Sequence, residues 1–360
     1  TDTADTQPRT DRLEEGLAPV HEVGQAQAQK HIYVEVHLLS VAVTTTSVAT
    51  TELIKRGWSL PTFQTFFLYA VLNLTYTPYT IWSYGFVAWA KMMLSLQSLA
   101  YLFLAVVDVE ANFAVLKAFS YSDMLSCMLL DAWATPACLI FAFFLVKARY
   151  HWSQIFGVIV CISGLGLLVT SDYHIDQTTK ADNKVIGDIL MLVGATGYGL
   201  SNALVDRFVR KRPLYEVMGA LGFFGCIVNA IQGVVLERDA ARNVPWNAST
   251  IAVLMAYVLG MVALYTLAPI LYRLSSSPFA NISILTSDFW GLAVGLVFYN
   301  YKPYWLYFVA FAVIMLGLII YFSVARPEDV APIEIVARGR QLDKQTQQRR
   351  TWLQTAAGSN

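Results

Sequence analysis

Long apolar runs alternate with short polar connections along most of the chain. A helix that crosses a membrane needs about 20 mostly apolar residues, because the hydrocarbon core is about 30 Å thick. No stretch shows the strand alternation of a membrane barrel. The pattern therefore predicts an all-α polytopic membrane protein with ten transmembrane helices, near residues 37–54, 62–82, 99–117, 122–145, 154–171, 186–206, 214–236, 250–272, 278–299 and 303–324.

Polar segments bound and divide this apolar region. Residues 1–36 are predicted to form a polar tail, and they contain no apolar signal-peptide core. Residues 326–360 are predicted to form a second polar tail. The longest connection, residues 172–185, separates a first half at 37–171 from a second half at 186–325. Ten spans return the chain to the side where it began, so both termini are predicted to face the cytosol.

A weak internal repeat relates the two halves. Aligning residues 117–136 with 273–293 matches three pairs in order: Lys117 with Arg273, Asp131 with Asp288, and Trp133 with Trp290. Each half then holds five spans, and because five is odd, the second half enters the membrane from the opposite side. The sequence therefore predicts two inverted five-helix repeats, a common transporter architecture with its site near the midplane between the halves.

Polar side chains inside predicted spans are candidate functional groups, because each charge costs about 2.5–3.5 kcal/mol to insert. In the third span, Asp108 and Asn112 lie four residues apart on one face, and Glu110 and Lys117 share another face. The tryptophans of the repeat suit stacking on a ring-bearing solute. The remaining candidates for substrate binding or coupling are Asp131, Trp133, Asn202, Arg273, Asn281, Asp288 and Trp290.

These residues allow two interpretations. Asp131 and Asp288 could pair with Lys117 or Arg273 and only lock helices together, while the tryptophans pack the bundle. Alternatively, a conformational change that separates an acid from a base alters the acid's proton affinity and couples protons to transport. Glu110 is the leading candidate for that role, because it shares a helix face with Lys117 but lies about 10 Å away along the axis.

Small residues and prolines predict how the spans pack. Glycines recur at helical spacing, as in the series Gly219, Gly222 and Gly225, and let helix backbones approach closely in lipid. Packing within one chain is the first interpretation, and a homodimer is the alternative. Pro136 and Pro269 are predicted kinks, because proline removes a helix hydrogen bond.

Composition excludes several classes of protein. Only 14% of the residues are charged, against about a quarter in soluble domains, and the net charge is zero, which argues against a nucleic-acid partner. The sequence has no GxSxG, HExxH or P-loop motif, so we expect neither an enzyme nor an ATP-driven pump, and no metal or cofactor. The four cysteines fall in apolar stretches and are predicted core residues: Cys127, Cys138, Cys161 and Cys226.

Three segments carry a resemblance to a known family. DVEANFAVLKAFSYSDMLSCMLLDAWATP, KARYHWSQIFGVIVCISGLGLLVTSD and GDILMLVGATGYGLSNAL resemble solute carrier family 35, subfamily F, of the drug/metabolite transporter superfamily. The segments RPLYEVMGALGFFG and YTLAPILYRLSSSPFANISILTSDFWG extend the match over about residues 37–324. The resemblance implies ten helices in two inverted halves with cytosolic termini. Relatives carry paired acids after the SN of GLSN, whereas this chain has Val205 and Asp206.

Together these observations favour a secondary transporter that works by alternating access on a small polar organic metabolite, and the family resemblance implies a nucleoside- or nucleobase-like compound. Acids outnumber bases near the predicted midplane, which favours a neutral or cationic solute. A nucleotide-sugar antiporter is the alternative, and a non-transporting membrane scaffold a further one. The expected partners are the solute and membrane lipid. The expected location is an endomembrane (Golgi, endoplasmic reticulum or vacuole) or the plasma membrane.

Overall fold

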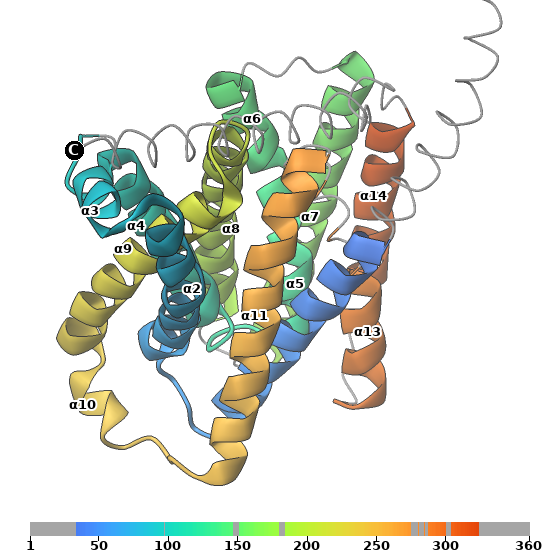
Figure 1. Cartoon of the computed structure of the whole chain (residues 1–360). Helices are drawn as coiled ribbons and strands as arrows, with labels where there is room; N and C mark the ends of the chain where they lie inside the picture. The colour runs from blue at the N-terminus through green and yellow to red at the C-terminus, as the bar shows by residue number, and fades with distance from the viewer. Residues whose placement is uncertain are drawn as a thin grey trace, which may run out of the picture.

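The computed structural model describes residues 34–96, 98–146, 151–179, 184–274, 280, 284, 287–299 and 304–323. Regular structure in these ranges is helical, without a strand, which confirms the all-α prediction. The helices, drawn in Figure 1, are 34–55, α2 Pro61–Tyr84, α3 Phe86–Met93, α4 Ser98–Ala118, α5 Met124–Asp131, α6 Ala134–Val146, α7 Trp152–Thr179, α8 Lys184–Val209, α9 Leu214–Leu236, α10 Arg238–Ala241, α11 Ala248–Leu274, α13 Ser287–Val297 and α14 Trp305–Phe322.

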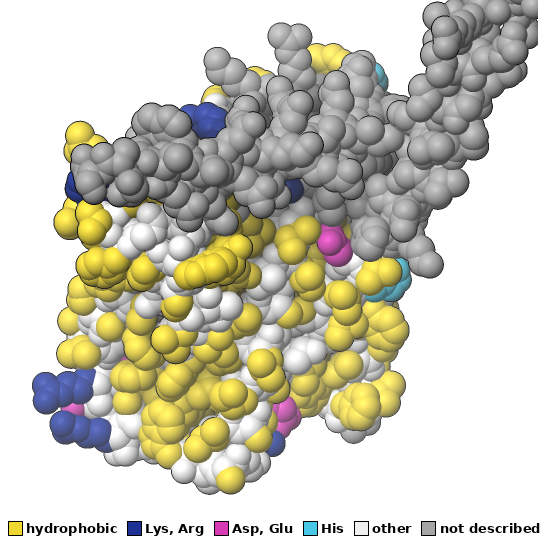
Figure 2. Space-filling view, viewed as in Figure 1, with side chains coloured by type: hydrophobic (Ala, Val, Ile, Leu, Met, Phe, Trp, Pro, Cys, Tyr) yellow, Lys and Arg dark blue, Asp and Glu magenta, His cyan; other side chains and the backbone are white. Residues whose placement is uncertain are grey.

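Within the described residues, five segments are long and apolar enough to cross a membrane. They are Ser98–Ala118, Met124–Leu145, Lys184–Val209, Leu214–Leu236 and Ala248–Arg273. In Figure 2, hydrophobic side chains spread over the middle of the visible face, and Lys and Arg side chains show at its lower left and in its upper part. An apolar belt with charges at its rim is the surface expected of a bundle that sits in lipid.

Two local predictions need correction. Residues 172–179, predicted to lie in the connecting loop, are helical because α7 continues to Thr179. The fourth predicted span is broken at Ala132 and Trp133 into α5 and α6. Pro136 accounts for this break, because it has no N–H to donate to the carbonyl of Ala132, which accepts from Thr135 N at 3.1 Å instead. At the second predicted kink, α11 continues through Pro269.

The glycine series Gly219, Gly222 and Gly225 faces α2, which packs along the whole of α9. A Cβ atom on Gly222 would lie 2.6 Å from the backbone nitrogen of Asn73. Helices α7 and α14 lie side by side in the same way (Figure 1), and a Cβ on Gly157 would lie 2.6 Å from the carbonyl oxygen of Gly317. These small residues pack helices within the chain, as predicted.

Buried apolar side chains fill the space between the helices. One cluster includes Leu72 and Leu221 from α2 and α9, and a second includes Leu129 and Ile314 from α5 and α14. Three of the four cysteines, Cys127, Cys138 and Cys161, are buried, which confirms their assignment to the core. The packed helices surround the central cavity described next.

Candidate functional site

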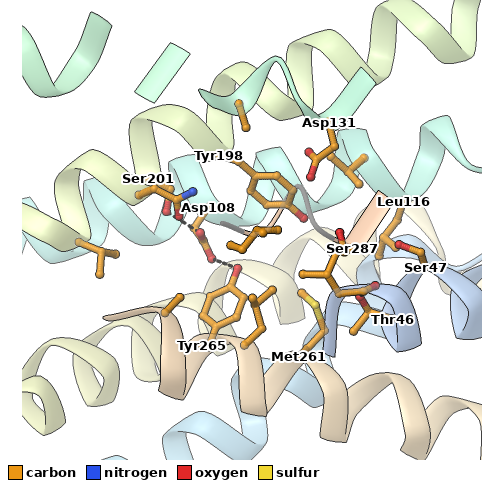
Figure 3. Close-up of a pocket in the computed structure, with 18 of the residues that line it drawn as sticks. Thr46, Ser47, Asp108, Leu116, Asp131, Tyr198, Ser201, Met261, Tyr265 and Ser287 are labelled. Carbon is orange, nitrogen blue, oxygen red and sulfur yellow. Dashed lines mark hydrogen bonds between the residues drawn. The ribbon is translucent and has the colours of Figure 1, made fainter. Parts of the chain in front are cut away.

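A cavity of about 150 Å³ lies at the centre of the bundle. Its walls come from helix 34–55 and from α4, α5, α6, α8, α9, α11 and α13 (Figure 3). Four tyrosines line it, and its polar wall also contains hydroxyl groups and two carboxyl groups. The residues used below are Thr46, Ser47, Asp108, Asp131, Tyr198, Ser201, Asn202, Tyr257, Tyr265, Tyr272 and Ser287.

Asp108 lies in the middle of α4 and is 3% exposed. Its Oδ2 accepts hydrogen bonds from the hydroxyls of Tyr69 at 2.6 Å and Tyr265 at 2.7 Å, and its Oδ1 accepts one from Ser201 at 2.5 Å. Hydrogen bonds to a charged acceptor are stronger than neutral ones, and a buried carboxylate needs them. Three donors from three other helices, α2, α8 and α11, therefore hold this acid in place.

Asn112 extends this network one helical turn further along α4. Its Nδ2 lies 3.0 Å from the hydroxyl of Tyr69 and 2.9 Å from that of Tyr265, and its Oδ1 accepts from the hydroxyl of Tyr198 at 2.9 Å. The prediction that Asp108 and Asn112 share one face is confirmed, because both take part in the same set of contacts. The network joins helices from the first and second halves of the chain.

Asp131 is the last residue of α5 and also lines the cavity. Figure 3 shows its carboxyl group pointing toward the ring of Tyr198. Its Oδ1 is buried without a hydrogen-bond partner among the described residues, so this oxygen does not form the ion pair with Lys117 or Arg273 that one of the two interpretations allowed. Within the helix break, the indole N–H of Trp133 donates to Thr196 Oγ1 at 2.8 Å, which fixes the break against α8. Asp131 therefore presents to the cavity a carboxyl group whose buried Oδ1 has no hydrogen-bond partner among the described residues.

The predicted basic residues lie outside the cavity wall. Lys117 is in the last turn of α4, with its Nζ 5.8 Å from the centroid of the Tyr121 ring. Arg273 donates from Nε to the carbonyl of Val209 at 2.8 Å and from a terminal nitrogen to that of Arg212 at 2.6 Å. None of the described residues that line the cavity is a lysine, arginine or histidine.

The remaining predicted residues fall in different places. Asn202 lines the cavity, as predicted for a site residue. Glu110 faces outward, where Gln232 Nε2 approaches its carboxylate at 3.2 and 3.4 Å. Trp290 is 54% exposed, so the prediction that it faces the bundle interior is wrong. Two predictions lie outside the described residues: Asn281 and the side chain of Asp288.

No local pattern in the sequence marks the tyrosines that contact Asp108 and Asn112. Tyr69, Tyr198 and Tyr265 sit in apolar helices where a tyrosine resembles any other large core residue. The sequence analysis also missed the buried acid Glu216, at the start of α9. Its carboxylate accepts hydrogen bonds from the hydroxyls of Tyr84 at 2.8 Å and Tyr101 at 2.9 Å. Its proximity to a basic loop made it resemble a surface residue.

Comparison with known proteins decides the family. A family model described as "SLC35F: Solute carrier family 35" matches residues 28–323. This chain belongs to solute carrier family 35, subfamily F. Family membership makes it an integral membrane solute carrier, and solute carriers are generally not enzymes.

Curated relatives agree with the family match. Solute carrier family 35 member F2 of Mus musculus is 31% identical over 82% of this chain and 80% of its own length. The F2 member of Xenopus tropicalis is 32% identical over 73% and 68%, respectively. An uncharacterized solute carrier family 35 member of Schizosaccharomyces pombe is 45% identical over 76% of this chain, which spans 54% of that protein's length.

A solved structure shares the fold of this solute carrier. The structure, titled "Crystal structure of protein", superimposes with a TM-score of 0.54 at 16% identity. The match covers 84% of this chain and 99% of the other. The likeness concerns the arrangement of helices alone.

Proposed function

We propose that this solute carrier is a secondary transporter that binds a small polar organic metabolite, nucleoside- or nucleobase-like, in the central cavity. The observation that carries the proposal is the lining of that cavity. It combines aromatic rings and hydroxyl groups with the carboxyl groups of Asp108 and Asp131, and none of its described residues is basic. Rings and hydroxyls suit a flat solute with hydrogen-bonding edges. Phosphate recognition normally uses arginine or lysine, so the lining favours a neutral or cationic solute.

Helix packing supports ten spans in two inverted repeats. In such a repeat, the second span of the first half is equivalent to the second span of the second half, and the fifth span of each half is equivalent to the fifth of the other. The equivalent pairs are α2 with α9 and α7 with α14, and both pairs are packed along their length. Contact between equivalent helices is expected beside a two-fold axis. Such an axis passes between the halves, where alternating access would open the cavity to one side and then the other.

The proposed topology has both termini in the cytosol. The ends of α8 and α11 and the start of α9 come together through Arg273, whose guanidinium contacts the connection between α8 and α9. That connection also carries Arg210, Lys211 and Arg212. A basic connection marks the cytosolic side of a membrane protein. Epitope tags at the two ends should both become accessible when only the plasma membrane is permeabilised, and tags on opposite faces would contradict ten spans.

Counterflow in proteoliposomes tests the transport proposal. Vesicles that contain the purified protein are loaded with one unlabelled solute and given a radiolabelled trace of the same solute outside. The panel comprises nucleosides, nucleobases, organic cations and nucleotide-sugars. We expect accumulation of a nucleoside, a nucleobase or an organic cation. Accumulation of nucleotide-sugars alone would favour the antiporter, and no accumulation together with a stably co-purifying protein would favour the scaffold.

A further inference from the structure

The two acids that line the cavity differ in one respect. The carboxylate of Asp108 accepts three hydrogen bonds, whereas Asp131 Oδ1 is buried and accepts none from the described residues. We propose, building on the transport function above, that Asp131 binds an ammonium group of the solute. The cavity then selects solutes that carry a protonated amine beside their ring system.

The missing partner is the first argument. A buried carboxyl oxygen without a hydrogen bond costs about 1–3 kcal/mol or more, so such groups recur where a ligand completes the site. Asp108 has no such deficit, because Tyr69, Tyr265 and Ser201 occupy its oxygens. The ligand-binding acid and the structural acid are thus distinct residues of one cavity.

The position of Asp131 at the end of α5 is the second argument. Asp131 is the last residue of α5, and the break that follows it is held by the hydrogen bond from Trp133 to Thr196. This bond fixes the backbone beside Asp131, so its carboxyl group is held at the cavity wall.

The surrounding wall favours an organic cation over a metal ion. Calcium or magnesium requires six or more oxygen ligands, and the described residues contain no cluster of acids, histidines and cysteines of that kind. An ammonium group donates three hydrogen bonds and is attracted to aromatic faces. The wall supplies the ring of Tyr198 and the hydroxyl-bearing residues Thr46, Ser47 and Ser287, as labelled in Figure 3.

Two matched pairs of probes test this assignment. 5′-Amino-5′-deoxyadenosine is compared with adenosine, and tyramine with 4-(2-hydroxyethyl)phenol; within each pair an ammonium replaces a hydroxyl. Kd is measured by calorimetry on the purified full chain, in sodium and in potassium buffers. The variants are Asp131→Asn and, as a control, Asp239→Asn, whose side chain is 94% exposed in α10.

We expect at least one ammonium probe to bind ten-fold or more tightly than its neutral partner. Asp131→Asn should abolish this preference, and Asp239→Asn should keep it. Equal binding within both pairs, a preference that survives Asp131→Asn, or no binding of either amine would overturn the proposal. A preference seen only in sodium buffer or only in potassium buffer would indicate that Asp131 binds one of these inorganic cations. That result would also overturn the proposal.

A second measurement covers the case in which Asp131→Asn does not fold. Dicyclohexylcarbodiimide modifies buried carboxyl groups, and mass spectrometry of the unsubstituted protein gives the rate of modification at Asp131. Tyramine should slow it at least three-fold and the neutral phenol should not; equal rates would overturn the proposal. Counterflow separates the two hypotheses: if adenosine exchanges but amines are not preferred, the transport function stands and the ammonium site fails. If no solute exchanges, the transport function fails.

Discussion

The hydroxyl of Tyr265 in α11 donates to Asp108 Oδ2 in α4 at 2.7 Å, so a helix of the second half is held by an acid of the first. Tyr265→Phe removes this donor with little change in shape. A hydrogen bond to a charged group contributes about 1.5–3 kcal/mol, against about 0.5–1.5 for a neutral one. We expect a larger fall in the unfolding temperature of the detergent-solubilised protein than Tyr76→Phe causes.

Tyr76 is a matched control, because its hydroxyl lies 2.9 Å from Thr266 Oγ1, a neutral group, and this contact also holds α11 to a helix of the first half, α2. Equal falls for the two tyrosine variants would show that Asp108 is not the strong acceptor inferred from the geometry.

Asparagine should lower stability at one of the two cavity acids and not at the other. Asp108→Asn replaces one acceptor oxygen with an amide donor that faces hydroxyl donors, so we expect a loss of about 1–3 kcal/mol. Asp131→Asn removes a buried carboxyl group that has no partner among the described residues, and the unfolding temperature should stay the same or rise. Thermal unfolding in detergent measures both. A fall of similar size for Asp131→Asn would reveal a partner in the native protein.

Glu237 joins α9 to α2 at the far end of these helices from Glu216. The backbone N–H groups of Thr62 and Phe63, in the first turn of α2, donate to its two oxygens at 2.9 and 3.0 Å. An acid at a helix N-terminus satisfies free N–H groups and complements the dipole, so Glu237→Ala should cost about 1 kcal/mol. The exposed Asp239→Asn in α10 is the control, and an equal effect on unfolding temperature would refute the capping role.

The close contact between α2 and α9 depends on Gly222. An added methyl group would lie 2.6 Å from the backbone nitrogen of Asn73 and 2.9 Å from the carbonyl carbon of Leu72. Backbone atoms cannot move aside cheaply, so Gly222→Ala should destabilise the protein by about 1–3 kcal/mol. Gly166→Ala in α7 meets no atom within 4 Å and should be neutral or slightly stabilising. Similar unfolding temperatures for the two variants would place α2 and α9 further apart.

The sequence predicted the helices well because apolar length and small-residue spacing are local signals. It also located the helix break, through Pro136, and the cavity acids Asp108 and Asp131. The sequence did not reveal which polar side chains face the cavity when one helix carries several of them. Successive residues turn by about 100°, so Glu110, two positions after Asp108, points to nearly the opposite side of α4. The rotation of a helix about its axis is set by its neighbours, which pattern alone does not reveal.

The alignment of the repeat had the same weakness. It placed Trp133 and Trp290 in equivalent positions, yet one donates to Thr196 within the bundle and the other is 54% exposed. Similar residues at equivalent positions can thus face different surroundings when the neighbouring helices differ. The tyrosines that hold Asp108 were beyond any local signal, because their partners are distant in sequence.

Glu110 provides the last prediction, because its sequence position suggested proton coupling and its surroundings do not. It does not line the cavity, and Gln232 lies beside its carboxylate on the outer face of α4 and α9. A residue couples protons to transport only if its proton affinity differs between the two states of the carrier. The contact of Glu110 is with a neutral amide, outside the cavity that alternating access would open and close. Glu110→Gln should therefore leave both counterflow and uptake driven by a pH gradient within about two-fold of the unsubstituted protein, a change of about 0.4 kcal/mol. Uptake into proteoliposomes with and without an imposed gradient is the measurement. Loss of gradient-driven uptake with counterflow preserved would restore the coupling role to Glu110 and would require α4 to rotate during the transport cycle.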